Sequence, residues 1–291
     1  MSSKKNVVEL AKTQVVLCDG AMGTMLQTYG LRSGKCPELW NVEQPNIVKS
    51  IHAAYVAAGS KIISTNTFGG NRLKLDSFGL GNRVRELNQA GVYIAREVAG
   101  NDCFVAVSIG PSGRFLEPLG DLTFDEAVAN FEEQAFAAAE AGADIILLET
   151  FSAIEEAKAA LSAAIKTGLP CFCTMAFDTG GRTMMGVSPV TAAKELTDFG
   201  ASGVGANCGL GPVETLEIIK QMRSATSNIL IAQPNAGLPK VVNGHTIYDS
   251  TPEDMAQFAI QAKAIGVNII GGCCGTTPEH IRAMAEKLST N

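Results

Sequence analysis

The chain has 291 residues, of which 46% are hydrophobic and 18% are charged, which excludes a disordered chain and leaves enough apolar sequence for a large core. Its 23 Lys and Arg residues are outnumbered by 29 Asp and Glu residues without any basic block, so we expect no nucleic-acid partner. No apolar run reaches the roughly 18 residues of a membrane span, and no signal-peptide core follows the polar residues 1–6. We therefore expect a cytoplasmic protein that does not associate with membranes.

Short apolar runs alternate with longer stretches rich in Ala, Glu and Lys, a pattern typical of repeated strand–helix units. In chain order, strands are predicted at 14–19, 61–65, 104–109, 144–149, 171–177, 203–207, 229–233 and 268–271. Helices are predicted at 46–58, 83–99, 124–141, 153–167, 190–199, 213–223, 252–265 and 278–288. Thr123 with Glu126, and Thr251 before Pro252, provide helix start signals, and Gly59 provides a stop signal before a strand.

Eight such units in a chain of this length predict a closed (β/α)8 TIM barrel. No Pro-rich or Ser-rich linker divides the sequence, so residues 1–291 are expected to form one domain. The alternative is an open, doubly wound sheet. It is less consistent with the sequence, because the first strand is followed by Gly20-Ala-Met-Gly23 rather than by a Gly-x-Gly-x-x-Gly or Walker A motif.

Three of the eight cysteines are predicted at the C-terminal ends of the strands, where TIM barrels carry their active sites. Cys208 follows the sixth strand, and Cys273 and Cys274 follow the eighth, with glycines on both sides that let the backbone approach a ligand closely. Three thiolates with one open position form the ligand set of a catalytic zinc ion. Cys18, Cys103, Cys171 and Cys173 are expected to be buried core residues, and Cys36 lies in a loop without an assigned role.

Five stretches of the sequence carry a family resemblance that extends from about residue 15 to residue 284. They are Asp19-Gly-Ala-Met-Gly-Thr24, Thr65-Asn-Thr-Phe68, Gly205-Ala-Asn-Cys-Gly209, Gln233-Pro-Asn-Ala-Gly237 and Gly271-Gly-Cys-Cys-Gly-Thr-Thr-Pro-Glu-His-Ile281. They resemble the signature stretches of the homocysteine S-methyltransferase family. The sequence is most similar to the homocysteine-binding module at the N-terminal end of cobalamin-dependent methionine synthase.

This resemblance implies one zinc ion held by Cys208, Cys273 and Cys274, with the homocysteine sulfur as the incoming ligand. It also implies a weak fourth ligand, which by position in the motif is the side-chain oxygen of Asn235; the alternative for Asn235 is a turn residue. Zinc suits the reaction because a free thiol is largely protonated at neutral pH, whereas a coordinated thiol is deprotonated. The expected reaction is attack of the homocysteine thiolate on a methyl group to give methionine.

The amino-acid part of homocysteine needs partners for an ammonium and a carboxylate group. By charge and by the resemblance, Asp19 and Glu149 are the expected ammonium partners, although Asp19 in a turn or helix-cap role is the alternative. The backbone amides around Gly20 and Ala21, together with the side chains of Thr67 and Ser108, are expected to bind the carboxylate; a purely structural role is the alternative for the last two.

The sequence specifies the methyl donor least well. The chain has no room for folate or corrinoid domains and no Asp-x-His-x-x-Gly loop, so methylcobalamin would come from a separate corrinoid protein or domain. A stand-alone enzyme that uses S-methylmethionine, S-adenosylmethionine or betaine is the alternative. For betaine, only Trp40 and Tyr29 are expected near the rim as members of an aromatic cage.

A third class of function is a non-catalytic zinc-binding or thiol-binding barrel, or a redox protein that uses Cys273 and Cys274. Adjacent cysteines form only a strained disulfide, and no Cys-x-x-Cys motif is present. The histidines His52, His245 and His280 lack the spacing of metal ligands and are expected to be structural or surface residues.

Overall fold

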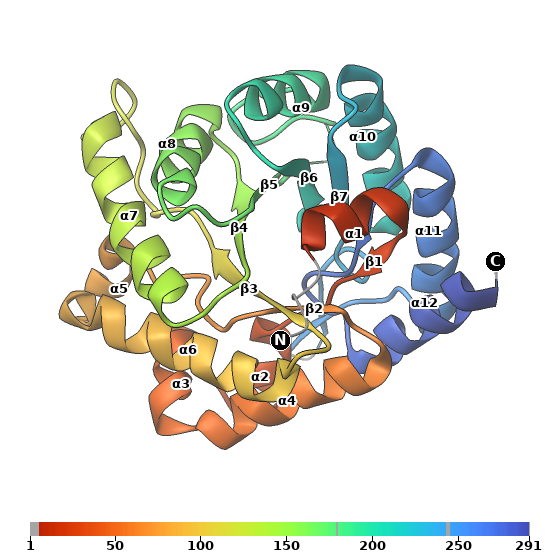
Figure 1. Cartoon of the computed structure of the whole chain (residues 1–291), viewed down its shortest axis with the longest axis horizontal. Helices are drawn as coiled ribbons and strands as arrows, with labels where there is room; N and C mark the ends of the chain where they lie inside the picture. The colour runs from red at the N-terminus through yellow and green to blue at the C-terminus, as the bar shows by residue number, and fades with distance from the viewer. Residues whose placement is uncertain (1–5, 179, 243–244, 291) are drawn as a thin grey trace.

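The computed structural model describes residues 6–178, 180–242 and 245–290, and its eight parallel strands form one sheet. The strands are β1 (Val16–Leu17), β2 (Ile62–Ser64), β3 (Phe104–Ile109), β4 (Ile145–Phe151), β5 (Cys171–Met175), β6 (Gly203–Asn207), β7 (Ile229–Gln233) and β10 (Ile269–Ile270). Their spatial order is β1-β10-β7-β6-β5-β4-β3-β2. A parallel bridge from Cys18 to Ile62 joins the two ends of this sheet, which confirms the predicted barrel (Figure 1).

Eight long helices surround the strands, and each predicted helix is present with bounds that differ by at most two residues. They are α4 (Pro45–Ala58), α6 (Val84–Ala99), α7 (Phe124–Glu140), α8 (Ile154–Ile165), α9 (Pro189–Asp198), α10 (Pro212–Ala225), α11 (Pro252–Ile265) and α12 (Pro278–Thr290). Thr123 and Glu126 form the predicted capping box at the start of α7, and Thr251 forms one with Asp254 at the start of α11. No helix in the described part of the chain is long and apolar enough to cross a membrane.

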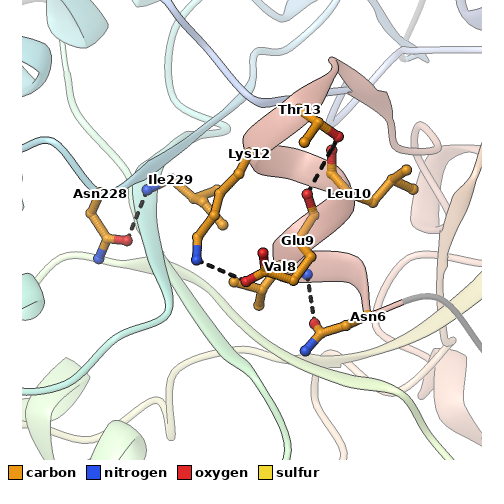
Figure 2. Close-up of polar contacts among 8 residues, drawn as sticks. All are labelled: Asn6, Val8, Glu9, Leu10, Lys12, Thr13, Asn228 and Ile229. Atoms are coloured by element: carbon orange, nitrogen blue, oxygen red, sulfur yellow. Dashed lines mark hydrogen bonds and ion pairs between the residues drawn. The ribbon is translucent and has the colours of Figure 1, made fainter.

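Helix α1 (Val7–Thr13), which the sequence pattern did not predict, closes the N-terminal end of the barrel. It lies across the centre of the ring in Figure 1, and its buried residues Val7 and Ala11 pack against the apolar interior of the strands. Figure 2 shows α1 beside the first residue of β7, Ile229, with the Asn6 side chain accepting a hydrogen bond from the Val8 amide at 2.9 Å. A helix of only two turns gives too short a hydrophobic pattern to be recognised in the sequence.

The loops contain further short elements that the sequence did not predict. They are α2 (Gly23–Thr28), η1 (Pro37–Leu39), α3 (Trp40–Glu43), α5 (Arg72–Asp76), η2 (Gly81–Arg83) and the antiparallel hairpin of β8 (Lys240–Val242) and β9 (His245–Ile247). Five strand predictions also had wrong bounds. The first strand is shorter at both ends, the fifth ends at Met175, and the fourth continues beyond Glu149 to Phe151; β2 and β10 are each one residue shorter at both ends than predicted. In β4 the pairing with β5 shifts register between Leu148 and Phe151, and this irregularity carries the chain past Glu149.

Candidate functional site

The inward-facing side chains change from apolar to polar as each strand approaches its C-terminal end. In β3, Phe104 and Ala106 belong to the apolar interior of the barrel, and in β4 Ile145 and Leu147 do so. Because side chains alternate along a strand, the next inward positions are polar. By this alternation the layer consists of Ser64, Ser108, Glu149, Thr174, Asn207 and Gln233. A polar floor therefore lies at the end of the barrel where TIM-barrel enzymes bind their substrates.

The three cysteines expected at this end lie together above the polar layer. The Sγ atoms of Cys208, Cys273 and Cys274 are all within 4.8 Å of one another, and within residues 6–178, 180–242 and 245–290 they are the sole group of this kind. Strand β7 lies between β6 and β10, and the end of β7 is hydrogen-bonded to both cysteine-bearing loops. The Cys208 amide donates to Gln233 O at 3.0 Å, and the Cys273 amide donates to Pro234 O at 2.7 Å. This arrangement offers three sulfur ligands to one metal ion.

The three thiols share protons unequally. Hydrogen bonds from Cys208 and Cys273 lower the pKa of the Cys274 thiol to about 3. Hydrogen bonds with Cys208 and Cys274 raise the pKa of Cys273 well above its usual value. A cation bound by the cluster would displace the thiol protons.

Gly209 fixes the backbone of the Cys208 loop, and its substitution gives a testable prediction. Its φ is +65°, and a Cβ atom there would lie 2.2 Å from the carbonyl oxygen of Phe177. Gly209→Ala is therefore expected to displace Cys208 and to lower the affinity of the cysteine cluster for a metal ion by roughly tenfold or more, since such strain costs about 1–3 kcal/mol. Titration against a chromophoric chelator measures this affinity. Gly186→Ala is the matched control, because Gly186 also has a positive φ but open space around a Cβ, and unchanged affinity in both variants would contradict the prediction.

Two carboxylates occupy the same end of the barrel. Asp19 is 2% exposed and accepts hydrogen bonds from the amide and hydroxyl of Ser64, at 2.7 and 3.0 Å. Burial raises the pKa of Asp19 to about 7, against the opposing effect of Ser64. Burial also raises the pKa of Glu149 to about 7, although the Ser108 hydroxyl donates to its carboxylate; the charge of Asp19 contributes to the increase. A cation that enters this end of the barrel would favour the charged form of both carboxyl groups and pair with them.

These groups line a cavity of about 390 Å³. Its walls include the three cysteines and all six residues expected to bind substrate: Asp19, Gly20, Ala21, Thr67, Ser108 and Glu149. Two of the expected carboxylate donors already have partners, because the Ala21 amide donates to Thr276 O at 3.1 Å and the Thr67 hydroxyl donates to Ser108 O at 2.8 Å. Asn235 lies outside the lining; it is 4% exposed, and its Oδ1 has no hydrogen-bond partner among the described residues.

Tyr248 is a site residue that the sequence did not indicate. Its ring packs on Gly275, where a Cβ atom would lie 2.3 Å from Tyr248 Cγ, and burial together with the neighbouring Cys274 raises the pKa of its hydroxyl. The expectation that only Trp40 and Tyr29 lie near the rim was therefore wrong. The unpredicted hairpin β8–β9 brings Tyr248 close to the cysteines. The length of the loop after β7 does not by itself predict this position.

The remaining cysteines and histidines have structural surroundings. All eight cysteines are free, and Cys18, Cys36, Cys103, Cys171 and Cys173 are buried. Cys36 donates a hydrogen bond to Glu38, which also accepts one from the Gly69 amide. His52 is buried in α4, and His280 contacts Thr277 and the Ser250 carbonyl, whereas the side chain of His245 lies outside the described residues.

Comparison with known proteins places this site in a family context. The family model for homocysteine S-methyltransferase matches residues 16–288. The methionine synthases of Mycobacterium leprae and Mycobacterium tuberculosis are 31% and 32% identical to the chain over 303 residues, which cover 98% of this chain and 25% of each relative. The chain thus spans about a quarter of the length of these relatives.

Among solved structures, the metallated form of the homocysteine methyltransferase MmuM from Escherichia coli matches 97% of this chain and 100% of its own, with a TM-score of 0.80 at 23% identity. At this identity the likeness supports the barrel fold. The family model extends from β1 into α12 and takes in both cysteine-bearing loops, and the chain therefore belongs to the homocysteine S-methyltransferase family.

Proposed function

We propose that this protein is a zinc-dependent homocysteine S-methyltransferase that forms methionine at the cavity, with residues 1–291 acting as one homocysteine-binding barrel. The observation that carries the proposal is the charge of the cavity wall. Three thiols and the carboxylates of Asp19, Glu149 and Glu38 line it, and its lining, drawn from the described residues, contains no Lys, Arg or His. Such a site calls for cations from outside the chain, and a metal ion together with a substrate ammonium supplies them.

The residues present fit a zinc site. Cys208, Cys273 and Cys274 would hold the ion, and the unpartnered, buried Oδ1 of Asn235 is the proposed weak fourth ligand. Asn235 is tied to both cysteine loops, because its amide donates to Leu210 O at 3.0 Å and the next amide donates to Cys274 O at 2.9 Å. When bound, zinc would supply the positive charge that keeps a coordinated thiol deprotonated at neutral pH.

The side chains of the barrel bind and orient the amino-acid part of the substrate. Asp19 and Glu149 pair with the ammonium group, and Ser108 holds Glu149 through its hydrogen bond. The substrate carboxylate is proposed to bind at the wall of Gly20, Ala21 and Thr67. Since the Ala21 amide and the Thr67 hydroxyl already donate within the protein, the carboxylate would have to replace those contacts. The buried position of the carboxylates excludes water from the ion pair and so strengthens it.

We propose methylcobalamin, held by a separate corrinoid protein or domain, as the methyl donor. One observation supports a large donor: the loops after the strands expose large apolar side chains. Phe115, Leu119 and Met184 are 55%, 70% and 77% exposed in the loops after β3 and β5. Among the described residues that line the cavity, Phe68 is the single aromatic one, which disfavours a cage for betaine.

Methionine formation from defined donors tests this function. Zinc-loaded protein is incubated with homocysteine and, separately, with methylcobalamin, S-methylmethionine, S-adenosylmethionine or betaine, and methionine is measured by mass spectrometry. Methylcobalamin is expected to give zinc-dependent methionine formation. Formation from S-methylmethionine or S-adenosylmethionine alone would establish the stand-alone alternative, and no methionine from any donor would contradict the proposed function.

The raised pKa values of the two carboxylates predict a pH-dependent affinity for the amino-acid part of the ligand. Methionine is the suitable probe, because its sulfur carries no proton whose release would add to the effect. The methionine ammonium stays charged between pH 5.5 and 8, whereas Asp19 and Glu149, with pKa values of about 7, gain their charge as the pH rises through this window. Affinity for methionine is therefore expected to increase with pH, by up to about tenfold per unit for one titrating carboxylate.

Isothermal titration of the zinc-loaded protein across this pH range measures the effect. Asp19→Asn is the matched variant, since it removes one titrating group and should flatten the profile. An affinity for methionine that stays constant from pH 5.5 to 8 would show that these carboxylates do not bind the ammonium.

A further inference from the structure

Asn207, the last residue of β6, has a buried carboxamide that joins three strands and a cysteine loop. The side chain is 1% exposed. Its Oδ1 accepts hydrogen bonds from the Thr150 amide at 2.8 Å and from the Thr174 hydroxyl at 2.7 Å. An amide N–H can only donate, so the atom that faces Thr150 N must be the carboxamide oxygen. The Nδ2 group is therefore the donor that faces the Glu149 carboxylate and the Thr150 hydroxyl.

Through Nδ2, the same carboxamide reaches the proposed ammonium site. Nδ2 lies 3.2 Å from Glu149 Oε2, and the Ser108 hydroxyl donates to Glu149 Oε1. Each carboxylate oxygen thus has one donor within the protein and keeps lone pairs for an ammonium. The backbone next to Glu149 is irregular, because β4 shifts register there and Thr150 has a φ of +68°. The Asn207 bond to the Thr150 amide stabilises this conformation, which determines the direction of the Glu149 side chain.

A third and longer contact of Nδ2, after those with Thr150 Oγ1 at 2.8 Å and Glu149 Oε2, is with a sulfur of the cysteine cluster. Nδ2 lies 3.8 Å from Cys273 Sγ, within the range of a hydrogen bond to sulfur. Homocysteine has a limited reach between its ammonium nitrogen and its sulfur, so the distance from Glu149 to the cysteine cluster must lie within that reach. A mismatch of about 1 Å is enough to cost roughly 100-fold in rate.

We propose that Asn207 is a positioning residue. It holds the ammonium-binding carboxylate of Glu149 and the metal-ligating sulfur of Cys273 at a separation that homocysteine can span. This inference rests on the proposed function and deepens it. Asn207 touches neither the reacting sulfur nor the methyl group in this arrangement; it acts through Glu149 and Cys273. Side chains alternate along β6, and this alternation places Asn207 in the inward-facing polar layer next to Glu149.

A double-mutant cycle on homocysteine affinity tests the proposal. Asn207→Asp keeps the size and the oxygen that faces Thr150 but replaces the Nδ2 donor with an oxygen that repels Glu149. By titration calorimetry on zinc-loaded protein, this variant is expected to bind homocysteine about tenfold or more weakly, in line with loss of a hydrogen bond to a charged group. In the Glu149→Gln background the same change is expected to alter affinity by less than about threefold, because the repulsion of Glu149 is absent and only the longer contact with Cys273 remains.

Two controls separate positioning from general destabilisation. Asn130→Asp places an aspartate at another buried asparagine, whose Oδ1 accepts from the Leu73 amide. Neither residue lines the cavity, so this variant should leave homocysteine affinity unchanged. Thr174→Val removes one anchor of Asn207 Oδ1 without changing side-chain size, and it provides the test if Asn207→Asp does not fold. It is expected to weaken homocysteine binding in the same direction, while zinc stoichiometry stays at one per chain.

Effects of Asn207→Asp and Glu149→Gln that simply add would overturn the proposal, as would unchanged homocysteine affinity in both Asn207→Asp and Thr174→Val. These outcomes differ from failure of the proposed function. If the function is wrong, the unmodified zinc-loaded protein does not bind homocysteine, whatever residue stands at position 207.

Discussion

Replacement of Cys273 by alanine is expected to abolish stoichiometric zinc binding and methionine formation while the barrel stays folded. Its sulfur is one of three within 4.8 Å of one another, and two thiols cannot hold the ion as three do. The side chain lies in a loop at the end of the barrel and not in the apolar core, so its loss should leave the fold intact. Metal analysis by mass spectrometry after dialysis measures the zinc content, and circular dichroism reports the fold.

Cys171→Ala is the matched control for this prediction. Cys171 is buried at the start of β5, and its thiol donates to the Leu169 carbonyl at 3.2 Å, remote from the cluster. This variant should retain one zinc per chain. Full zinc content and full activity in Cys273→Ala would remove the cysteine cluster from the mechanism, and loss of zinc in Cys171→Ala would show that the assay reports misfolding and not ligation.

Replacement of Glu149 by glutamine is expected to weaken homocysteine binding by roughly 30-fold or more with zinc retained, since removing one partner of a buried ion pair costs about 2–5 kcal/mol. Glutamine keeps the shape and the acceptor for Ser108 but loses the charge that is proposed to pair with the ammonium. Affinity for a simple thiol without an amino group, such as 2-mercaptoethanol, should be unchanged. Titration calorimetry of both ligands with the zinc-loaded protein measures the difference.

Glu156→Gln is the control for loss of a buried carboxylate as such. Glu156 is 6% exposed in α8, accepts hydrogen bonds from the amide and hydroxyl of Ser112, and does not line the cavity. Its substitution should leave homocysteine affinity unchanged. Equal loss of homocysteine affinity in the two variants would mean that Glu149 has no specific role in recognising the ammonium.

The sequence was sufficient for the elements that form the barrel wall, because long amphipathic helices and apolar strands repeat a clear pattern. The start signals of Thr123 with Glu126, and of Thr251 before Pro252, marked two helix starts correctly. It was not sufficient for α1, which buries only Val7 and Ala11 and owes its position to the barrel interior beneath it. Tertiary packing, which a local pattern does not record, determines such short elements.

The cysteines of the site could be placed from the sequence because each follows a strand, and parallel strands end at the same edge of the barrel. The residues that contact these cysteines and the carboxylates could not be predicted from the sequence. Tyr248 reaches Cys274 only through the fold of the β8–β9 hairpin, and Ser64 meets Asp19 only because the barrel closes between β1 and β2. Asn207 appeared as a strand-end residue, but its link between Glu149 and Cys273 depends on side-chain geometry across three strands.

The central claim is that one zinc ion bound by Cys208, Cys273 and Cys274 receives the homocysteine sulfur. Zinc K-edge X-ray absorption of the purified protein, without and with homocysteine, tests it most directly. The account predicts three sulfur ligands and one lighter atom in the free protein, and four sulfur ligands after homocysteine is added. Absence of zinc, or a ligand shell that homocysteine leaves unchanged, would contradict the account.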